Sequence, residues 1–221
     1  KREFLRQRFF QQINRVRMEN LRSRISPHFT FNVLGREINQ FNGSEEVKHN
    51  LMELVKYLRR SLELTEKLSV SLQDELDFVR TYIELERGRV GEDFVATITV
   101  EDGLDATRIM IPSMIVQVPV ENAIKHGLAG KDGKKELMVY VSRETNGIRI
   151  TVTDNGRGYL PQVVSATRGT GTGLKVLYQT IQLLNTKNKS DKIRFNITNR
   201  SDGQTGTEVS VYIPFRFSYD L

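Results

Sequence analysis

Three polar, glycine-rich stretches in the second half of the chain have the residue types that a nucleotide site needs. They read VPVENAIKHG at 118–127, DNGRG at 154–158 and GTGTGLK at 169–175. On a helix, Lys125 and His126 would share a face with Asn122, because they follow it by three and four residues. The side-chain carbonyl of Asn122 is an oxygen ligand of the kind that Mg²⁺ takes beside phosphate oxygens. The alternative is a helix with an exposed polar face.

The two glycine-rich stretches could supply backbone contacts to such a ligand. Gly156 and Gly158 follow Asp154 at the end of a predicted strand, where glycines let the backbone approach a planar ligand closely. Gly171, Gly173 and Leu174 stand at a predicted helix start, where free amide groups form an anion site. No GxxxxGK[ST] motif is present. Taken alone, DNGRG would also fit a hairpin turn.

A further candidate for chemistry lies in ISPHFTFN, residues 25–32. A neutral imidazole such as that of His28 is a good nucleophile near pH 7, and phosphoryl transfer asks mainly for positioning and electrostatic support. Asn32 lies one helical turn later, where its amide could orient the imidazole or an attacking water. The alternative is a structural histidine in a helix.

These motifs, in this order, resemble those of two known families. The three glycine-rich stretches resemble the GHKL (Bergerat-fold) ATP-binding domain, and ISPHFTFN resembles the NPHFLFN phosphoacceptor segment of the LytS-like sensor histidine kinases. Ser26 and Thr30 depart from that form, and no acidic residue follows His28. The resemblance implies a kinase that moves the γ-phosphoryl group of MgATP to His28 and then to an aspartate of a response regulator.

The resemblance also implies roles within the ATP site. Asn122 would bind Mg²⁺, Lys125 the phosphates, and His126 the ribose or a phosphate. Asp154 would accept a hydrogen bond from the adenine amino group, and Thr207 after Gly206 would help to hold adenine. Residues 159–170 match the position of the ATP lid, and the remaining cofactor-binding positions are Gly156, Gly158, Gly171, Gly173 and Leu174.

The residue at one position bears on whether ATP is hydrolysed or its phosphoryl group is transferred to histidine. The ATPases of the GHKL group carry a water-activating glutamate one turn before the metal-binding asparagine, and that position here is Val118. Glu121 stays as a possible acid or base. A GHKL ATPase or a nucleotide-binding pseudokinase scaffold is the alternative function, and a basic membrane-surface or nucleic-acid adaptor is a third.

The elements that must position these residues fall into two groups. Helical periodicity over residues 1–41, interrupted by Pro27, and over 45–67 predicts a helical hairpin. A lone hairpin cannot bury both apolar faces, so we expect a homodimer that forms a four-helix bundle. The apolar residues predicted on the face of the second helix are Val47, Leu51, Leu54, Val55, Leu58 and Leu62.

The rest of the chain mixes strands and helices. Ser71, followed by Asp74 and Glu75, predicts a capped helix with Leu72, Leu76, Val79 and Ile83 inward. Alternation predicts strands at 94–100, 137–142, 147–154, 192–199 and 208–215, and helices fit 113–127 and 172–185. The expected fold is α+β: a hairpin over 1–68, then a GHKL α/β sandwich over 69–221 with helices on one sheet face. The linker is expected near 65–71.

Composition narrows the class of protein. The chain has no cysteine, and its longest apolar stretch, 109–120, is too short to cross a bilayer. Its net charge of +6 comes from residues 1–24, as expected beside a membrane segment or on a solvated helix face. No nucleic-acid recognition motif accompanies that charge. We expect the cytoplasmic portion of an inner-membrane sensor, joined to an N-terminal sensor and transmembrane part, with a receiver domain as partner.

Overall fold

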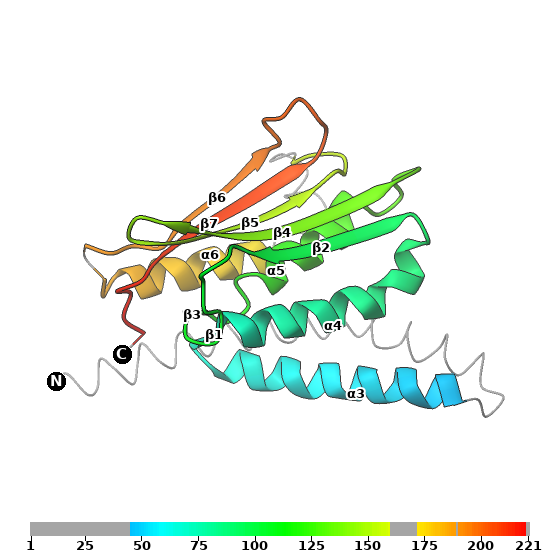
Figure 1. Ribbon diagram of the computed structural model, residues 1–221, viewed down its shortest axis with the longest axis horizontal. Helices are drawn as coiled ribbons and strands as arrows, with labels where there is room; N and C mark the ends of the chain where they lie inside the picture. The colour runs from blue at the N-terminus through cyan, green and yellow to red at the C-terminus, as the bar shows by residue number, and fades with distance from the viewer. Residues whose placement is uncertain (1–44, 160–171, 189, 220–221) are drawn as a thin grey trace.

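The computed structural model describes residues 45–159, 172–188 and 190–219. His28 and Asn32, the two predicted catalytic residues of the hairpin, lie outside the described residues, as does Gly171. The described part comprises a long helix, a five-stranded sheet covered by helices and a separate two-stranded sheet (Figure 1). The expected α+β fold is confirmed.

The helical elements are α3 (Glu45–Glu66), α4 (Leu72–Val90), α5 (Gln117–Asn122), the π-helix η1 (Ala123–Gly127) and α6 (Thr172–Asn185). The strands are β1 (Ser69–Ser71), β2 (Phe94–Val100), β3 (Met110–Pro112), β4 (Lys135–Glu144), β5 (Gly147–Asp154), β6 (Arg194–Asn199) and β7 (Thr207–Pro214). Each strand predicted from alternation is present. The predicted helix at 172–185 coincides with α6.

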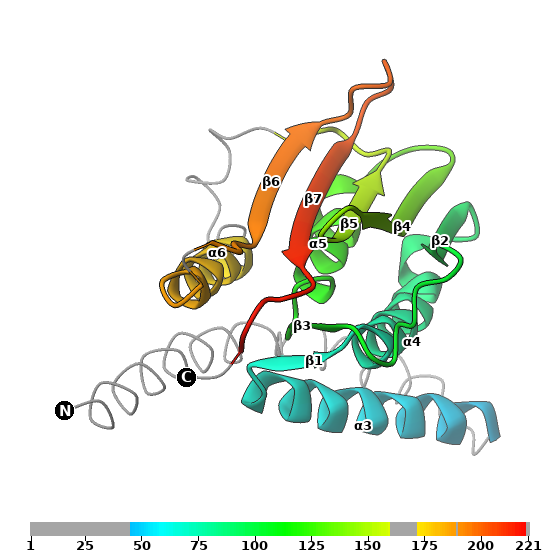
Figure 2. The ribbon, with the colours of Figure 1, turned by 60° about the vertical axis from the view of Figure 1, so that its left-hand side comes forward.

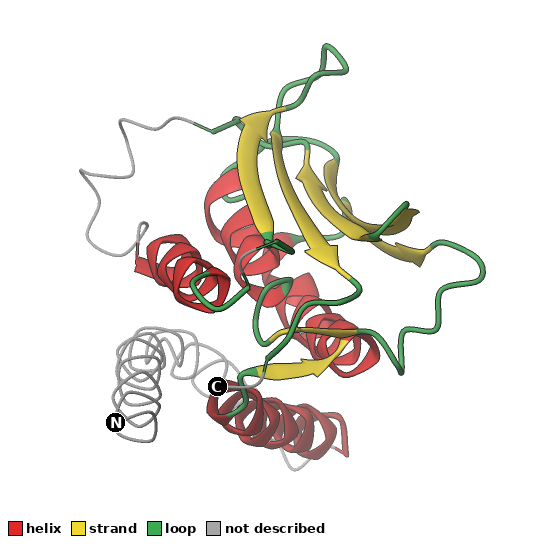
Figure 3. Cartoon of the chain, turned by 90° about the vertical axis from the view of Figure 1, so that its left-hand side faces the viewer, coloured by secondary structure: helices red, strands yellow, loops and turns green. Residues whose placement is uncertain are grey.

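The large sheet has the strand order β2-β4-β5-β7-β6. β2 and β4 are parallel, and the other neighbours are antiparallel. Alternate side chains such as Val139 and Ile150 are buried beneath the helices, whereas Met138 and Tyr140 on the opposite face are exposed. The helices α4, α5 and α6 lie on one face of the sheet (Figure 3). The expected one-sided sandwich is therefore confirmed.

The helix α4 begins as its sequence predicts. The Ser71 hydroxyl accepts a hydrogen bond from the Asp74 amide at 3.0 Å and so caps the first turn. Leu72, Leu76, Val79 and Ile83 are all buried, as expected from their spacing. These side chains of α4 and the buried side chains of the large sheet belong to one apolar core.

The helix α3 packs on α4, on the side of α4 that faces away from the large sheet (Figure 2). The rings of Tyr57 and Phe78 stack with their centroids 4.9 Å apart. Leu54, Tyr57, Ser61 and Leu64 are buried there. Of these four residues, only Leu54 belongs to the apolar face predicted for α3. The helix α3 thus packs on α4 through a face that differs from the predicted one.

The stretch expected to be the linker, near 65–71, contains β1, which pairs with β3 in antiparallel register. One local expectation was wrong. The helix expected over 113–127 begins only at Gln117, because residues 113–116 form a turn after β3. None of the helices in the described ranges combines the length and the apolar composition that crossing a bilayer requires.

Candidate functional site

The first glycine-rich stretch folds as a short α-helix that widens into a π-helix. α5 ends at Asn122, and η1 follows without interruption. The Leu128 amide donates to the Ala123 carbonyl at 2.8 Å, an i→i+5 bond that closes the wider turn. Such π-turns are frequent at functional sites. This one carries Lys125 and His126.

The side chain of Asn122 has a fixed orientation. Its Nδ2 donates to the Val118 carbonyl one turn earlier, at 2.8 Å. The amide nitrogen is thereby used inside the helix, and the carbonyl oxygen faces away from it. A hard oxygen held in this way fits the ligand preference of Mg²⁺, which the sequence predicts at this residue. Among the described residues, no cluster of His, Cys, Asp or Glu offers an alternative metal site.

Lys125 and Glu121 form an ion pair across one helical turn. Both side chains are partly buried, with 26% and 15% of their surface exposed. The pair holds the ammonium group of Lys125 beside the helix that carries Asn122. Glu121 is the residue predicted as a possible acid or base. In this arrangement its carboxylate is paired with the ammonium group of Lys125.

His126 is half-buried between charged neighbours. Its pKa lies below the ordinary value, first because burial penalises the charged imidazolium and then because Lys125 and Arg157 are positive; Glu121 opposes the shift. The imidazole is therefore neutral at pH 7. A neutral imidazole can both donate and accept a hydrogen bond, which fits a contact to ribose or phosphate.

Asp154 ends β5 as a buried carboxylate. Its Oδ1 accepts hydrogen bonds from the Gly156 amide at 2.8 Å and from the Thr207 amide at 3.4 Å. Burial raises the pKa of Asp154, and the bonds from Gly156 and Thr207 and the charge of Arg200 limit that rise. The carboxylate is thus aligned by backbone donors, as an acceptor for a ligand amino group requires. Thr207, predicted to act beside Asp154, contacts it directly.

Glycines from three segments pack around Asp154. A β-carbon on Gly156 would lie 2.2 Å from the Gly127 carbonyl oxygen, and one on Gly206 would lie 1.9 Å from the Asp154 carbonyl oxygen. A β-carbon on Gly127 would lie 2.8 Å from Asp154 Oδ1. Gly127 is not among the residues predicted for the site. The sequence feature that could have identified Gly127 is its position at the end of η1. A residue with a side chain there would keep η1 from approaching the turn after β5.

The turn that leaves the site toward the predicted lid is anchored by Asn199. Gly158 has a φ of 86°, a conformation that favours glycine, and the Tyr159 amide donates to Asn199 Oδ1 at 2.6 Å. Asn199 ends β6, so the anchor comes from the edge of the large sheet. Of the predicted lid, 159–170, only Tyr159 lies within the described residues.

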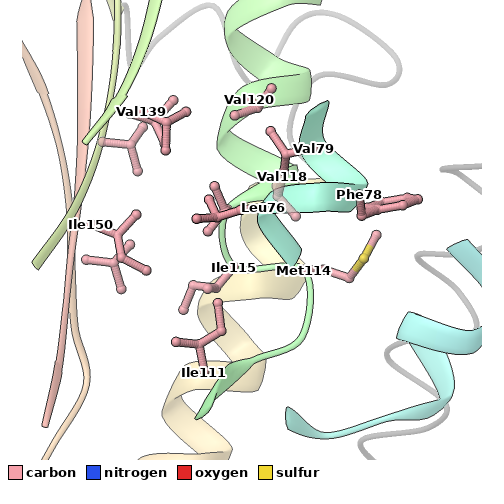
Figure 4. Close-up of a cluster of buried hydrophobic side chains, with 14 of the residues drawn as sticks. Leu76, Phe78, Val79, Ile111, Met114, Ile115, Val118, Val120, Val139 and Ile150 are labelled. Atoms are coloured by element: carbon pink, nitrogen blue, oxygen red, sulfur yellow. The ribbon is translucent and has the colours of Figure 1, made fainter. Parts of the chain in front are cut away.

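The start of α6 meets α5. A β-carbon on Gly173 would lie 3.5 Å from a methyl group of Val118, an ordinary contact distance, and Leu174 packs against the core. Val118 is itself buried. The position that carries a water-activating glutamate in GHKL ATPases thus holds a buried methyl group here. Val118 and Val120 lie beside Leu76 and Val79 in the core that supports the helix (Figure 4).

The fold therefore brings most of the predicted ATP-site residues together. The π-helix carries Lys125 and His126 directly after Asn122, and Gly127 at its end touches Asp154, which in turn contacts Gly156 and Thr207. Gly158 lies beside the end of β6, and Gly173 lies against α5. The amide oxygen, the cationic and neutral side chains and the buried carboxylate can serve metal, phosphate and base recognition within one site.

Two family models match the chain in succession. Residues 16–94 match the model described as "Histidine kinase", and residues 107–216 match "Histidine kinase-, DNA gyrase B-, and HSP90-like ATPase". The second match contains every described residue of the candidate site. The first contains His28, Asn32 and the α3–α4 pair.

Curated relatives match over most of the chain. It is 28% identical over 202 residues to "Sensor histidine kinase YpdA" of Escherichia coli, with 91% of this chain and 34% of the relative covered. It is 32% identical over 197 residues to "Sensor histidine kinase/phosphatase LytS" of Staphylococcus aureus, with 85% and 33% covered. The chain thus spans about a third of the length of these relatives.

A solved structure has the same fold. The histidine kinase domain of the Erythrobacter litoralis EL346 blue-light activated histidine kinase aligns with a TM-score of 0.51 at 15% identity, over 93% of this chain and 94% of that chain. At this identity the likeness concerns the fold alone.

Proposed function

The chain belongs to the sensor histidine kinases, and from that premise we propose that it is the catalytic core of a LytS-like kinase, which binds ATP and transfers its γ-phosphoryl group to His28. The observation that carries the proposal is the arrangement around Asp154 and Asn122. A buried acceptor aligned by backbone donors and an oriented amide oxygen lie on segments joined by the Gly127–Asp154 contact. These groups suit the adenine end and the phosphate end of one nucleotide.

Each side chain of the site has a proposed task in binding. Asp154 accepts from the adenine amino group, and Thr207 holds Asp154 and the base edge. Lys125 and His126 contact the phosphates or the ribose, and the amide of Gly173 in the first turn of α6 meets the phosphates. Asn122 would hold Mg²⁺, which would supply positive charge to offset that of the phosphates.

Transfer to His28 is a displacement at the γ-phosphorus. The lone pair of an imidazole nitrogen forms the N–P bond as the bond from phosphorus to the β–γ bridging oxygen breaks, and ADP leaves. The remaining ring proton passes to water, and Asn32 orients the imidazole. The protein contributes positioning and electrostatic support, which is most of what this reaction requires. A receiver-domain aspartate then accepts the phosphoryl group from the histidine.

The hydrolase alternative is less favoured by the site. Val118 occupies the position of the water-activating glutamate and is buried, and Glu121 is engaged by Lys125. Neither residue supplies a free carboxylate for activating water. Phosphoryl transfer to a side chain needs no such base for water, so the site suits a kinase better than an ATPase.

The assembly follows from the same premise. Residues 1–68 form the dimerisation and phosphoacceptor hairpin, residues 69–221 form the ATP-binding domain, and two hairpins make the bundle. The chain spans only about a third of its relatives, which leaves room for a sensor and membrane part. In this proposal that part precedes the basic residues 1–24, and the core lies on the cytoplasmic side of the inner membrane. The receiver domain of a response regulator is the protein partner, and no nucleic acid is required.

Metal-dependent nucleotide binding tests the site. A fluorescent ATP analogue should bind the intact fragment, and unlabelled ATP should displace it more effectively with Mg²⁺ than with EDTA. Asn122→Ala should remove most of the Mg²⁺ dependence, whereas Asn196→Ala, an exposed asparagine on β6, should not change it. Equal Mg²⁺ dependence in Asn122→Ala would contradict the assignment of the metal ligand.

A further inference from the structure

A buried carboxylate from α4 holds the turn that leads into the nucleotide helix. Glu75 is fully buried, and its two oxygens accept from the amides of Met114 at 2.7 Å, Val116 at 2.6 Å and Gln117 at 3.2 Å. A buried charge is costly unless hydrogen bonds compensate it, and bonds to a carboxylate are among the strong ones. Glu75 lies in the first turn of α4, as the sequence predicts. Its side chain, however, binds the start of another helix, α5.

The start of α5 depends on this carboxylate. Val116 precedes the helix and offers no side-chain cap, and the first amides of a helix have no partner within the helix. Glu75 supplies the missing acceptor to Val116 and Gln117. Its negative charge also lies at the positive end of α5, which is the favourable arrangement.

The turn itself has a strained backbone. Met114 has a φ of 71°, and it is the one non-glycine residue with a positive φ among those described. Such a conformation persists when the surroundings over-determine it. The Met114 amide is held by Glu75, and its side chain is buried near Phe78 of α4 (Figure 4). The helix α4 therefore fixes both the backbone and the side chain of this residue.

The same turn is also attached to the hairpin helix. The Ser113 amide donates to the Leu68 carbonyl at 3.1 Å, and the Ser113 hydroxyl donates to the Leu64 carbonyl at the end of α3. Ser113 is buried. The turn is thus bound by α3 on one side and by Glu75 on the other, directly before the helix that ends in Asn122.

We propose that Glu75 is a positioning residue for the nucleotide site, which sets the start of α5 and thereby the place of Asn122. Asn122 is five residues beyond Gln117, so a rigid helix carries any change of direction at its start to the amide oxygen. Mg²⁺ demands near-ideal octahedral geometry, so small displacements of a ligand are costly. This inference rests on the proposed function of Asn122 and Asp154 as parts of a MgATP site.

The test compares three variants of the full fragment. Glu75→Gln replaces one acceptor oxygen by an NH₂ donor that faces backbone donors. Glu75→Asp keeps the charge and shortens its reach. Glu84→Gln makes the same exchange at an exposed carboxylate on α4 and is the control. Amide hydrogen exchange of Met114, Val116 and Gln117, thermal unfolding and MgATP affinity are measured for each.

Glu75→Gln should speed exchange at the three amides and raise the Kd for MgATP about tenfold, as is usual when the partner that orients a ligand is lost. Glu75→Asp should lie between it and the wild type, and Glu84→Gln should match the wild type. A folded Glu75→Gln with wild-type exchange and affinity would overturn the inference. So would an affinity loss that only follows the unfolded fraction. If Glu75→Gln does not fold, Glu75→Asp decides by the same two readouts.

The proposed function and the positioning role of Glu75 can be disproved separately. A wild-type fragment that binds no MgATP would contradict the proposed function. It would also contradict the positioning role of Glu75, which presupposes a nucleotide site. A wild type that binds MgATP while the Glu75 variants bind equally well would contradict the positioning role alone.

Discussion

The carboxylate of Asp154 lies so close to the α-carbon of Gly127 that a β-carbon on residue 127 would be 2.8 Å from Oδ1. This contact joins the end of the helix that carries Asn122 to the strand end that carries the adenine acceptor. The spacing between the two ends of the nucleotide site is therefore fixed by one glycine. Substitutions at either residue test this geometry.

Gly127→Ala should damage both stability and nucleotide binding. The added methyl group must displace the Asp154 carboxylate, at a cost of about 1–3 kcal/mol in unfolding free energy. ATP affinity should fall as well, because the displaced carboxylate no longer meets the adenine amino group. Gly133→Asn is the control, since Gly133 has a φ of 70° that asparagine tolerates and nothing lies within 4 Å of an added β-carbon. Equal unfolding curves for the two variants would refute the contact.

Asp154→Asn should separate binding from stability. The amide oxygen can keep the bonds from Gly156 and Thr207, but its nitrogen would oppose the adenine amino group, so ATP affinity should fall roughly 10- to 100-fold. Burial raises the pKa of Asp154, so the ionised wild type loses stability as pH rises through that pKa. At pH 7.5 the variant should therefore be at least as stable as the wild type.

Calorimetric unfolding and ATP titration give both quantities for Asp154→Asn. The exposed Asp102→Asn serves as the control and should leave both unchanged. A variant with wild-type affinity for ATP would contradict the role assigned to Asp154.

His126 should make the fragment less stable in acid. Its pKa in the folded state is depressed, so the neutral form favours folding above the unfolded pKa of about 6.5, and that contribution is lost as pH falls through the folded pKa. Between pH 7.5 and 5.5 the wild type should lose more stability than His126→Gln. His49→Gln, at an exposed position of α3, should follow the wild-type profile. Parallel profiles for wild type and His126→Gln would show that this imidazole is not desolvated.

Gln117→Met should raise stability. Within the described ranges, neither polar atom of the buried Gln117 side chain has a hydrogen-bond partner. A buried unpaired amide costs about 1–3 kcal/mol, and methionine has a similar shape without polar hydrogens, so a gain of about 1 kcal/mol is expected. Thermal unfolding against Gln182→Met, an exposed site on α6, measures the difference. A lower melting temperature for Gln117→Met alone would indicate that the amide has a partner in solution.

Local patterns in the sequence predicted much of this fold. The alternation at 147–154 and the apolar period at 172–185 matched β5 and α6, because in both elements the buried side chains recur with the period of the backbone. The Ser71 cap was also predictable, since its acceptor and donor are three residues apart. Such features depend on neighbours in the chain.

Features that depend on distant residues were not predictable from local patterns. β1 has three residues and pairs with β3 about 40 residues later, so nothing in its own sequence distinguished it from a linker. An acidic residue in the first turn of α4 is expected whether or not its side chain also binds another helix. The sequence around Glu75 therefore did not indicate its contact with Val116, 41 residues later. The close approach of Gly127 to Asp154 is visible only in the folded chain. The π-turn likewise arises where η1 must reach the β5 turn.

The central claim is that this chain phosphorylates His28 with ATP. The most direct measurement is incubation of the fragment with Mg²⁺ and γ-labelled ATP, followed by acid and alkali treatment of the wild type, His28→Gln and His49→Gln. Acid-labile, alkali-stable label on the wild type and on His49→Gln, but not on His28→Gln, is the predicted result. Tight ATP binding by the wild type without any label, or label that persists in His28→Gln, would contradict the claim.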